Sequence, residues 1–193
     1  MPKTYRIGFT RAALINETVL VAKEYCDALS WEDVKRRVSS NNLLQARTLT
    51  SANRLLSEIS QRLVLLNDAQ IELIAADYAS DVRQLIWIAL CKKHPFIADF
   101  TSEVLLPLHA RGRFEITYDD YDYFFNAKAD WHPELDKSSD KSRRNARQTL
   151  FLMLHQCDIL SDSNQLIPQM ISSAVQNCSS ESDLAFIPGA IRL

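Results

Sequence analysis

The sequence predicts a mainly helical protein, and three observations support this fold class. Only three of the 193 residues are glycine, which disfavours sandwiches, barrels and doubly wound folds, because these need glycine for tight turns and phosphate loops. Apolar residues recur at helical spacing through most of the chain, and several such segments follow a side chain that can cap a helix. The alternation of polar and apolar residues that is typical of strands is confined to short stretches in the second half.

Residues 1–94 are expected to form an N-terminal helical bundle. Most of its helices are expected to begin beside a side chain that accepts hydrogen bonds from the first free backbone N–H groups. These expected caps are Asn16, Ser30, Asn67 and Ser80. The longest helix is expected over residues 50–66, where leucine or isoleucine recurs every four residues and forms one apolar stripe.

Residues 95–168 show a different order of elements. A helix that starts at Pro95 and ends near Ala110 precedes a short strand at 113–116, and a capped helix then runs from Thr117 to about residue 130. A basic helix and a polar β-hairpin follow; their expected bounds are Ser138 or Ser139 to Gln156, and 158–168. Helix, strand, helix, basic helix and hairpin is the order of a winged helix-turn-helix, in which the third helix enters the major groove.

The remaining segment, residues 169–193, is expected to form a C-terminal helix over about 168–177 and a loose tail, both packed on the rest of the protein. The whole expectation is therefore a mainly α fold, with a helical bundle followed by a winged helix-turn-helix-like half that contains a small β-hairpin.

Two basic stretches stand out in a chain whose net charge is −2. Residues 34–57 contain five Lys or Arg and no acid, and residues 137–147 contain five Lys or Arg and a single acid, Asp140. The two stretches carry formal charges of +5 and +4, so the rest of the chain carries −11. Because phosphate affinity depends on where cations are concentrated, the local charge suggests a nucleic-acid contact that the overall charge hides.

Charged helix faces are commonly no more than solvated surfaces, and the second stretch has that simple alternative. Its position on the expected recognition helix favours nucleic-acid contact, as do two amides that can read adenine or brace phosphate. In the first stretch, hydroxyls and amides lie between the cations, and these donors suit either phosphates or helix caps. The candidate DNA-binding residues are Lys141, Arg143, Arg144, Asn145, Arg147 and Gln148, with a second area at Lys35, Arg37, Arg47 and Arg54.

No pattern in the sequence supports catalysis, a metal or a cofactor. Phosphate-binding loops, nucleophile elbows and paired metal-ligand spacings are absent from the sequence, and the four histidines are scattered. The acidic run at 118–125 is interpreted as helix capping plus core aromatics rather than as a cation site. The four cysteines are isolated, so we expect buried thiols in a reducing cytoplasm. The longest apolar run, Leu85–Cys91, is too short to span a bilayer.

The chain resembles the BrxA family of the bacteriophage exclusion (BREX) systems from Tyr5 to about Pro168. The segments that carry the resemblance are 42–48, 51–55, 85–91 and 124–132. The resemblance implies a small helical protein, similar in part to the NusB fold and associated with DNA. It also implies a role in phage defence beside a methyltransferase, an ATPase and a phosphatase-like protein, and it provides no catalytic residues to carry over.

The expected function is therefore that of a non-enzymatic accessory protein that binds double-stranded DNA, mainly through phosphates. One alternative is a protein-interaction adaptor whose basic areas meet an acidic surface of a defence-complex partner. A second alternative is RNA binding, which the resemblance to NusB-like proteins suggests. The expected location is the cytoplasm.

Overall fold

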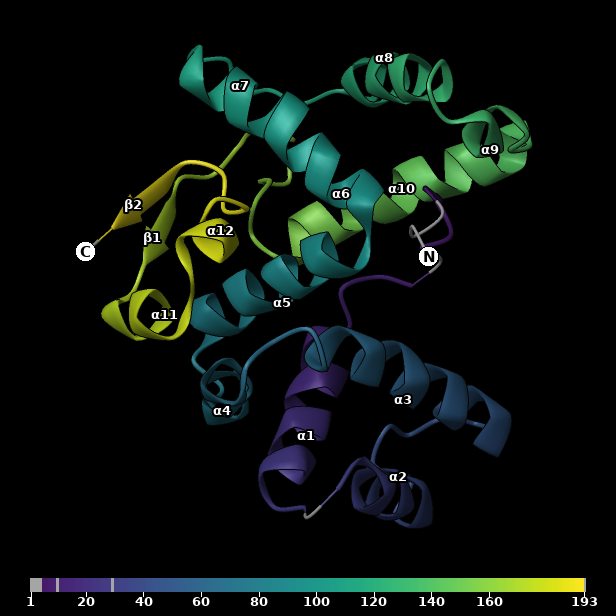
Figure 1. Ribbon diagram of the computed structural model, residues 1–193, viewed down its shortest axis with the longest axis vertical. Helices are drawn as coiled ribbons and strands as arrows, with labels where there is room; N and C mark the ends of the chain where they lie inside the picture. Colours follow the sequence, from purple (N-terminus) through teal and green to yellow (C-terminus); the bar gives the residue numbers. More distant parts are fainter. Residues whose placement is uncertain (1–4, 10, 29, 193) are drawn as a thin grey trace.

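The computed structural model describes residues 5–9, 11–28 and 30–192, and over these residues the protein is mainly helical, as expected (Figure 1). The helices and strands are α1 (Ile15–Cys26), α2 (Trp31–Ser40), α3 (Leu49–Leu63), α4 (Asp68–Ala76), α5 (Ala79–Lys93), α6 (Pro95–Phe100), the π-helical turn η1 (Thr101–Leu105), α7 (Leu106–Ala110), α8 (Tyr118–Ala129), α9 (Pro133–Asp136), α10 (Asp140–Gln156), β1 (Gln169–Ile171), α11 (Ser173–Cys178), α12 (Glu181–Leu184) and β2 (Ala190–Arg192).

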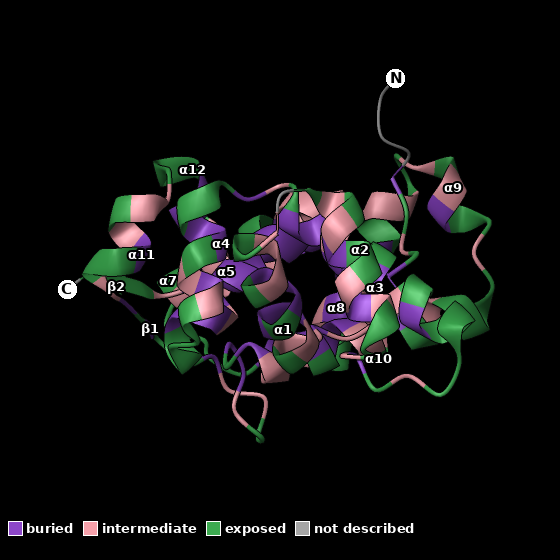
Figure 2. Ribbon diagram, turned by 90° about the horizontal axis from the view of Figure 1, so that it is seen from below, coloured by how far each residue is buried: buried purple, intermediate pink, exposed green. Residues whose placement is uncertain are grey.

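The core is organised around α5. Every residue from Gln84 to Cys91 is buried, as expected for a helix that is apolar on most of its surface. Helices from both halves of the chain pack on it, including α1, α3, α4 and α6. Figure 2 shows the buried residues gathered in the middle of the molecule. One continuous buried cluster extends along the sequence from Tyr5 to Ile187, so the three expected segments share it.

Capping chemistry sets most of the helix starts. The expected caps Ser30, Asn67 and Thr117 each accept a hydrogen bond from a backbone N–H in the first turn, and of the two candidates before α10 it is Ser139 that does so. Asn67 and Thr117 each complete a capping box, with Gln70 and Asp120 respectively.

Two expected caps are wrong. Asn16 lies inside α1, which begins at Ile15 after Leu14 in the left-handed region, because packing of these two apolar residues on the core sets the start. Ser80 lies inside α5, which begins at Ala79, because the chain turns sharply at Asp77 with φ 66°. At α1 the left-handed residue is the N-cap itself, whereas Asp77 ends α4 and the extended Tyr78 precedes α5; sequence periodicity reports neither.

The helix after Pro95 is interrupted by the π-turn η1. Pro107 has no backbone N–H and cannot donate to the carbonyl of Glu103, so the regular α-helical hydrogen-bond pattern is interrupted there. The backbone N–H of Leu106 bonds the carbonyl of Thr101 instead, which is the wider spacing of a π-helix. The helix then continues as α7 and ends at Ala110, with Gly112 at φ 72° beyond it, as the sequence predicts.

Three short extended segments lie next to the α8–α10 unit. Residues 159–167 form a small hairpin, in which the Ile167 N–H donates to the Ile159 carbonyl at 2.9 Å and Leu160 pairs with Leu166. The expected strand at 113–116 joins this hairpin through an antiparallel bridge between Glu115 and Gln165. The expected helix, extended segment, α8, α10 and hairpin therefore follow one another along the chain, but the short helix α9, which the expected order lacks, lies between α8 and α10.

The C-terminal segment differs from the expected helix at 168–177. Residues 169–171 form strand β1, which pairs in parallel with β2, and of the expected helix only residues 173–177 are helical, as part of α11. The amide of Gln169 donates to the carbonyls of Asp158 and Ile167, so the side chain stabilises extended backbone. The tail is also ordered, because Leu184 and Ile187 are buried and the Trp87 indole donates to the Phe186 carbonyl at 2.9 Å.

Candidate nucleic-acid interface

Helix α10 presents two different polar faces. Its apolar residues, among them Ala146, Leu150 and Met153, are buried against the core. A solvent-facing stripe carries Lys141, Arg144, Asn145 and Gln148, all exposed and at positions i, i+3, i+4 and i+7 of the helix. Within the described residues, no carboxylate lies within salt-bridge distance of Lys141 or Arg144. Two cations and two amides thus form one open stripe on this helix.

The other two arginines of α10 are engaged with α8. The Arg147 guanidinium donates to Asp122 and lies 4.4 Å from the centre of the Tyr118 ring, and its side chain is only 20% exposed. Arg143 donates to the amide oxygen of Asn126 and stacks 4.1 Å from the centre of the Phe125 ring. The sequence groups these arginines with Arg144, whereas the structure turns them toward α8.

The second basic area lies on α2, α3 and the segment between them. Lys35, Arg47 and Arg54 are exposed, and Arg54 lines a shallow pocket of about 360 Å³ together with polar residues of α3. The guanidinium of Arg37 lies 3.8 Å from a carboxylate oxygen of Glu24 on α1, so its charge is partly compensated. This area lies across the N-terminal segment from α10 (Figure 1).

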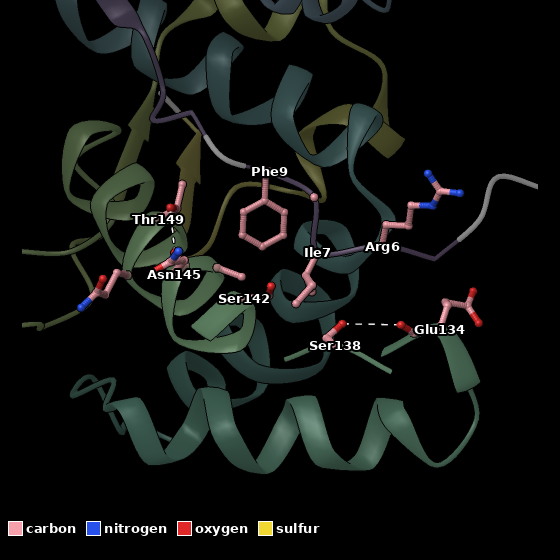
Figure 3. A pocket seen from close by; sticks show the side chains of 11 residues that line it. Arg6, Ile7, Phe9, Glu134, Ser138, Ser142, Asn145 and Thr149 are labelled. Atoms are coloured by element: carbon pink, nitrogen blue, oxygen red, sulfur yellow. Dashed lines mark hydrogen bonds between the residues drawn. The ribbon is translucent and has the colours of Figure 1, made fainter. Parts of the chain in front are cut away.

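A groove runs beside the open stripe of α10 (Figure 3). One wall is residues 5–9, which we call the N-terminal strap, and the other is α9 with the first half of α10. The groove has a volume of about 580 Å³. Its lining residues are Arg6, Ile7, Gly8, Phe9, Glu134, Ser138, Ser142, Asn145, Ala146, Gln148 and Thr149. Arg6 is not among the candidate residues predicted from the sequence, because it lies outside both basic stretches, with its nearest cations, Lys3 and Arg11, three and five positions away.

The BrxA family model matches residues 3–183 of this chain. The chain belongs to the BrxA family. A curated relative, "BREX protein BrxA" from Escherichia coli O9:H4 (strain HS), is 28% identical over 116 residues, which cover 60% of this chain. The matched region spans only 53% of the length of that relative, or about half.

A solved structure, described as an uncharacterized protein from Magnetospirillum magneticum, resembles this BrxA family protein with a TM-score of 0.77. The likeness covers 92% of each chain at 15% sequence identity. At this identity the likeness concerns the fold.

The described part of this BrxA family protein contains no group of three or more His, Cys, Asp or Glu side chains placed to hold a metal ion. None of its described helices is long and apolar enough to span a bilayer.

The acidic run at 118–125 begins just after Thr117, which forms the capping box with Asp120, and Tyr121, Phe124 and Phe125 of the run are buried. This confirms the interpretation of the run as helix capping plus core aromatics.

The expectation for the cysteines is only half right. Cys91 and Cys157 are buried, and burial raises the pKa of both thiols, that of Cys157 to about 12. Cys178 is half-buried and Cys26 is exposed at the end of α1. Burial of part of its surface and the nearby Glu72 carboxylate nevertheless raise the pKa of Cys26, so its thiol is a weak nucleophile at neutral pH.

Proposed function

We propose that this BrxA family protein binds double-stranded DNA, mainly through phosphates, as a non-enzymatic accessory protein of a BREX phage-defence system. The observation that carries the DNA proposal is the open stripe of α10, where Lys141 and Arg144 lie beside Asn145 and Gln148. The BREX role is supported by family membership and by the name of the curated relative. In this proposal the protein acts in the cytoplasm, and its partners are the methyltransferase, ATPase and phosphatase-like components of the BREX system.

The element order supports a winged helix-turn-helix-like docking mode. In this arrangement α10 is the recognition helix, α8 is the helix that precedes it across the short helix α9, and residues 159–167 are the wing. The tip of the wing, residues 161–164, carries Asp162 and no Lys or Arg. We therefore assign the phosphate contacts to α10 rather than to the wing.

Within the candidate residues, the structure supports different roles. Lys141, Arg144, Asn145 and Gln148 are proposed as DNA contacts, and exposed Lys35, Arg47 and Arg54 as a second contact area. Arg143 and Arg147 are proposed to brace α10 against α8, because their guanidinium groups already have partners there. Arg37 is proposed as a weaker contributor because of Glu24.

A salt titration of binding to a labelled duplex tests the proposal. Five uncompensated cations would neutralise about five phosphates, so log K should fall with log salt at a slope of about −4.5. Several duplexes of different sequence should show similar affinity, because phosphate contacts carry little sequence information. Binding that does not respond to salt would contradict phosphate contact.

A protein adaptor is a second candidate, and one observation favours it. Tyr123 and Trp131, at the outer side and the end of α8, are 80% and 83% exposed, the highest values among the exposed large apolar side chains of the described residues. Exposed aromatic side chains are common anchors of protein interfaces. Pulldown of complex members after nuclease digestion separates the candidates, because contacts made through DNA are lost and direct protein contacts survive. The RNA alternative is tested by asking whether RNA or single-stranded DNA displaces the labelled duplex from the protein.

A further inference from the structure

The groove beside α10 supports an inference that rests on the proposed DNA binding and extends it to a part of the chain outside both basic stretches. Within the N-terminal strap, Tyr5 and Phe9 are buried, whereas Arg6 and Gly8 are exposed. The strap is therefore held at both ends, and its middle faces solvent beside the open stripe of α10 (Figure 3).

Tyr5 fixes the first end of the strap by three contacts. Its hydroxyl donates to a carboxylate oxygen of Asp99 in α6 at 2.8 Å, and its backbone N–H donates to Glu134 in α9 at 3.1 Å. Its ring stacks on His132, with ring centres 3.9 Å apart and planes within 8°. Burial and the bond to Asp99 raise the pKa of Tyr5, so the hydroxyl remains a donor.

Phe9 fixes the second end of the strap. Its ring packs 5.7 Å from His94 and 5.9 Å from Phe96, measured between ring centres. Arg6 is therefore carried on backbone that is already ordered, next to the buried Tyr5. A contact made from a preorganised segment loses less conformational entropy on binding than one made from a mobile arm.

The dimensions of the duplex determine what the strap would meet. An α-helix with its side chains is about 10–12 Å across, and the major groove is about 12 Å wide, so a recognition helix fills the groove. A segment that lies along the side of that helix must then face the phosphate strand that borders the groove. In this protein the strap lies along the side of α10, so it would face that phosphate strand.

We propose that the N-terminal strap forms a second wall of the DNA site, and that Arg6 binds a backbone phosphate at the edge of the major groove that α10 enters. Figure 3 shows Arg6 extending away from Asn145 and Thr149, toward the outside of the groove, which suits a phosphate rather than a base edge. No carboxylate of a described residue lies within salt-bridge distance of the Arg6 guanidinium, so its charge is available.

The rest of the lining agrees with a contact to the DNA backbone. Ser142 brings a hydroxyl group to the same groove, and hydroxyls are regular phosphate donors, whereas Ser138 and Thr149 donate theirs to the backbone carbonyls of Glu134 and Asn145. Glu134 is the only acid among the lining residues, and one of its carboxylate oxygens accepts the Tyr5 N–H. Figure 3 shows Glu134 at the same end of the groove as Arg6, and the side next to Asn145 has no carboxylate among the lining residues.

The test compares salt titrations of the full chain on one labelled duplex. R6A should weaken binding about eightfold at about 0.1 M salt and make the log–log salt slope shallower by about 0.9, because one phosphate contact is lost. R6K retains a cation at the position and should restore the slope. The matched control is R192A, which removes an exposed arginine from β2 at the far end of the molecule (Figure 1) and should leave the slope unchanged.

The comparison separates failure of this inference from failure of the proposed function. If R144A makes the salt slope shallower while R6A has the same slope as R192A, the strap does not contact DNA and the proposed function stands. If the wild-type protein shows no salt-dependent binding, both fail. A salt slope in R6K that stays as shallow as in R6A would also overturn the phosphate contact, because the slope depends on the charge at this position and both residues carry one.

Discussion

Arg143 and Arg144 are neighbours in the sequence but lie on different faces of α10. Arg143 stacks on Phe125 and donates to Asn126, while Arg144 is exposed with no carboxylate partner among the described residues. One step along a helix rotates the side chain by about 100°. A basic stretch is therefore a mixture of cations that stabilise the fold and cations that remain free for a ligand.

Replacement of Arg144 and Arg147 one at a time should separate these two roles. R144A should weaken DNA binding and leave the free energy of unfolding within about 0.5 kcal/mol of wild type, because the side chain is exposed. R147A should lower the free energy of unfolding by about 1–2 kcal/mol, because it removes a cation–π contact and a partly exposed ion pair. Urea unfolding and DNA anisotropy measure the two quantities. The same binding defect in both variants without a stability difference would contradict the assignment.

Glu58 links stability to pH. Burial alone would raise the pKa of its carboxyl group, but the hydrogen bond from Lys93 and the charge of Arg62 outweigh burial and hold the pKa below its usual value. A carboxylate with a lowered folded-state pKa stabilises the protein fully above its unfolded pKa, about 4.3, and loses that contribution as pH falls through the folded pKa.

We therefore expect the free energy of unfolding to decline below about pH 5, and part of that decline should disappear in E58Q. The variant should also be less stable than wild type at neutral pH, because Arg62, 1% exposed, would lose its charged partner. Urea titrations at several pH values measure both effects. An identical pH dependence in E58Q would show that Glu58 does not contribute to it.

At the scale of elements, the pairing of β1 with β2 depends on a glycine. Gly189 precedes β2 with φ 62°, and a Cβ atom at this position would lie 2.6 Å from Nε2 of His109. G189A should therefore destabilise the protein by about 1 kcal/mol or more, through backbone strain and steric overlap. G8A is the matched control, because a Cβ at Gly8 would meet nothing within 4 Å. Thermal unfolding of both variants measures the difference, and equal melting temperatures would contradict it.

Capped helices were predictable from the sequence, but elements that depend on distant partners were not. Ser30, Asn67 and Thr117 act within one helical turn, so their effect is visible in the local sequence. Strand β1 exists because β2 pairs with it from 21 positions further along, and residues 169–171 have no strong local preference that reveals this. The mainly α class followed from local signals, whereas the small sheet required tertiary information.

The candidate site shows the same division. The open stripe of α10 lies within the basic stretch found in the sequence, so its location was predictable. The carboxylates that engage Arg37 and Arg147 come from α1 and α8, and no count of charges along residues 34–57 or 137–147 includes them. Arg6 reaches the groove because Tyr5 is anchored to Asp99 and Glu134, two residues far along the chain.

At the scale of the whole molecule, the three expected segments share one buried cluster. We therefore expect a single cooperative unfolding transition rather than separate melting of residues 1–94 and 95–168. The three tryptophans report on different places, since Trp31 lies in the N-terminal helices, Trp87 in the core and Trp131 beside α9. Fluorescence and far-ultraviolet circular dichroism should give coincident urea curves. Two resolved transitions would instead support independent domains.

The anchoring of Tyr5 between α6 and α9 also has a practical consequence for how the protein is handled. Any polypeptide fused directly ahead of Tyr5 would emerge next to the groove and the open stripe of α10 (Figure 1). If the proposed site is correct, a histidine-rich purification tag in that position should obstruct the duplex or add its own affinity for it. A tag placed after β2 would emerge at the opposite end of the molecule, where it would leave binding measurements undisturbed.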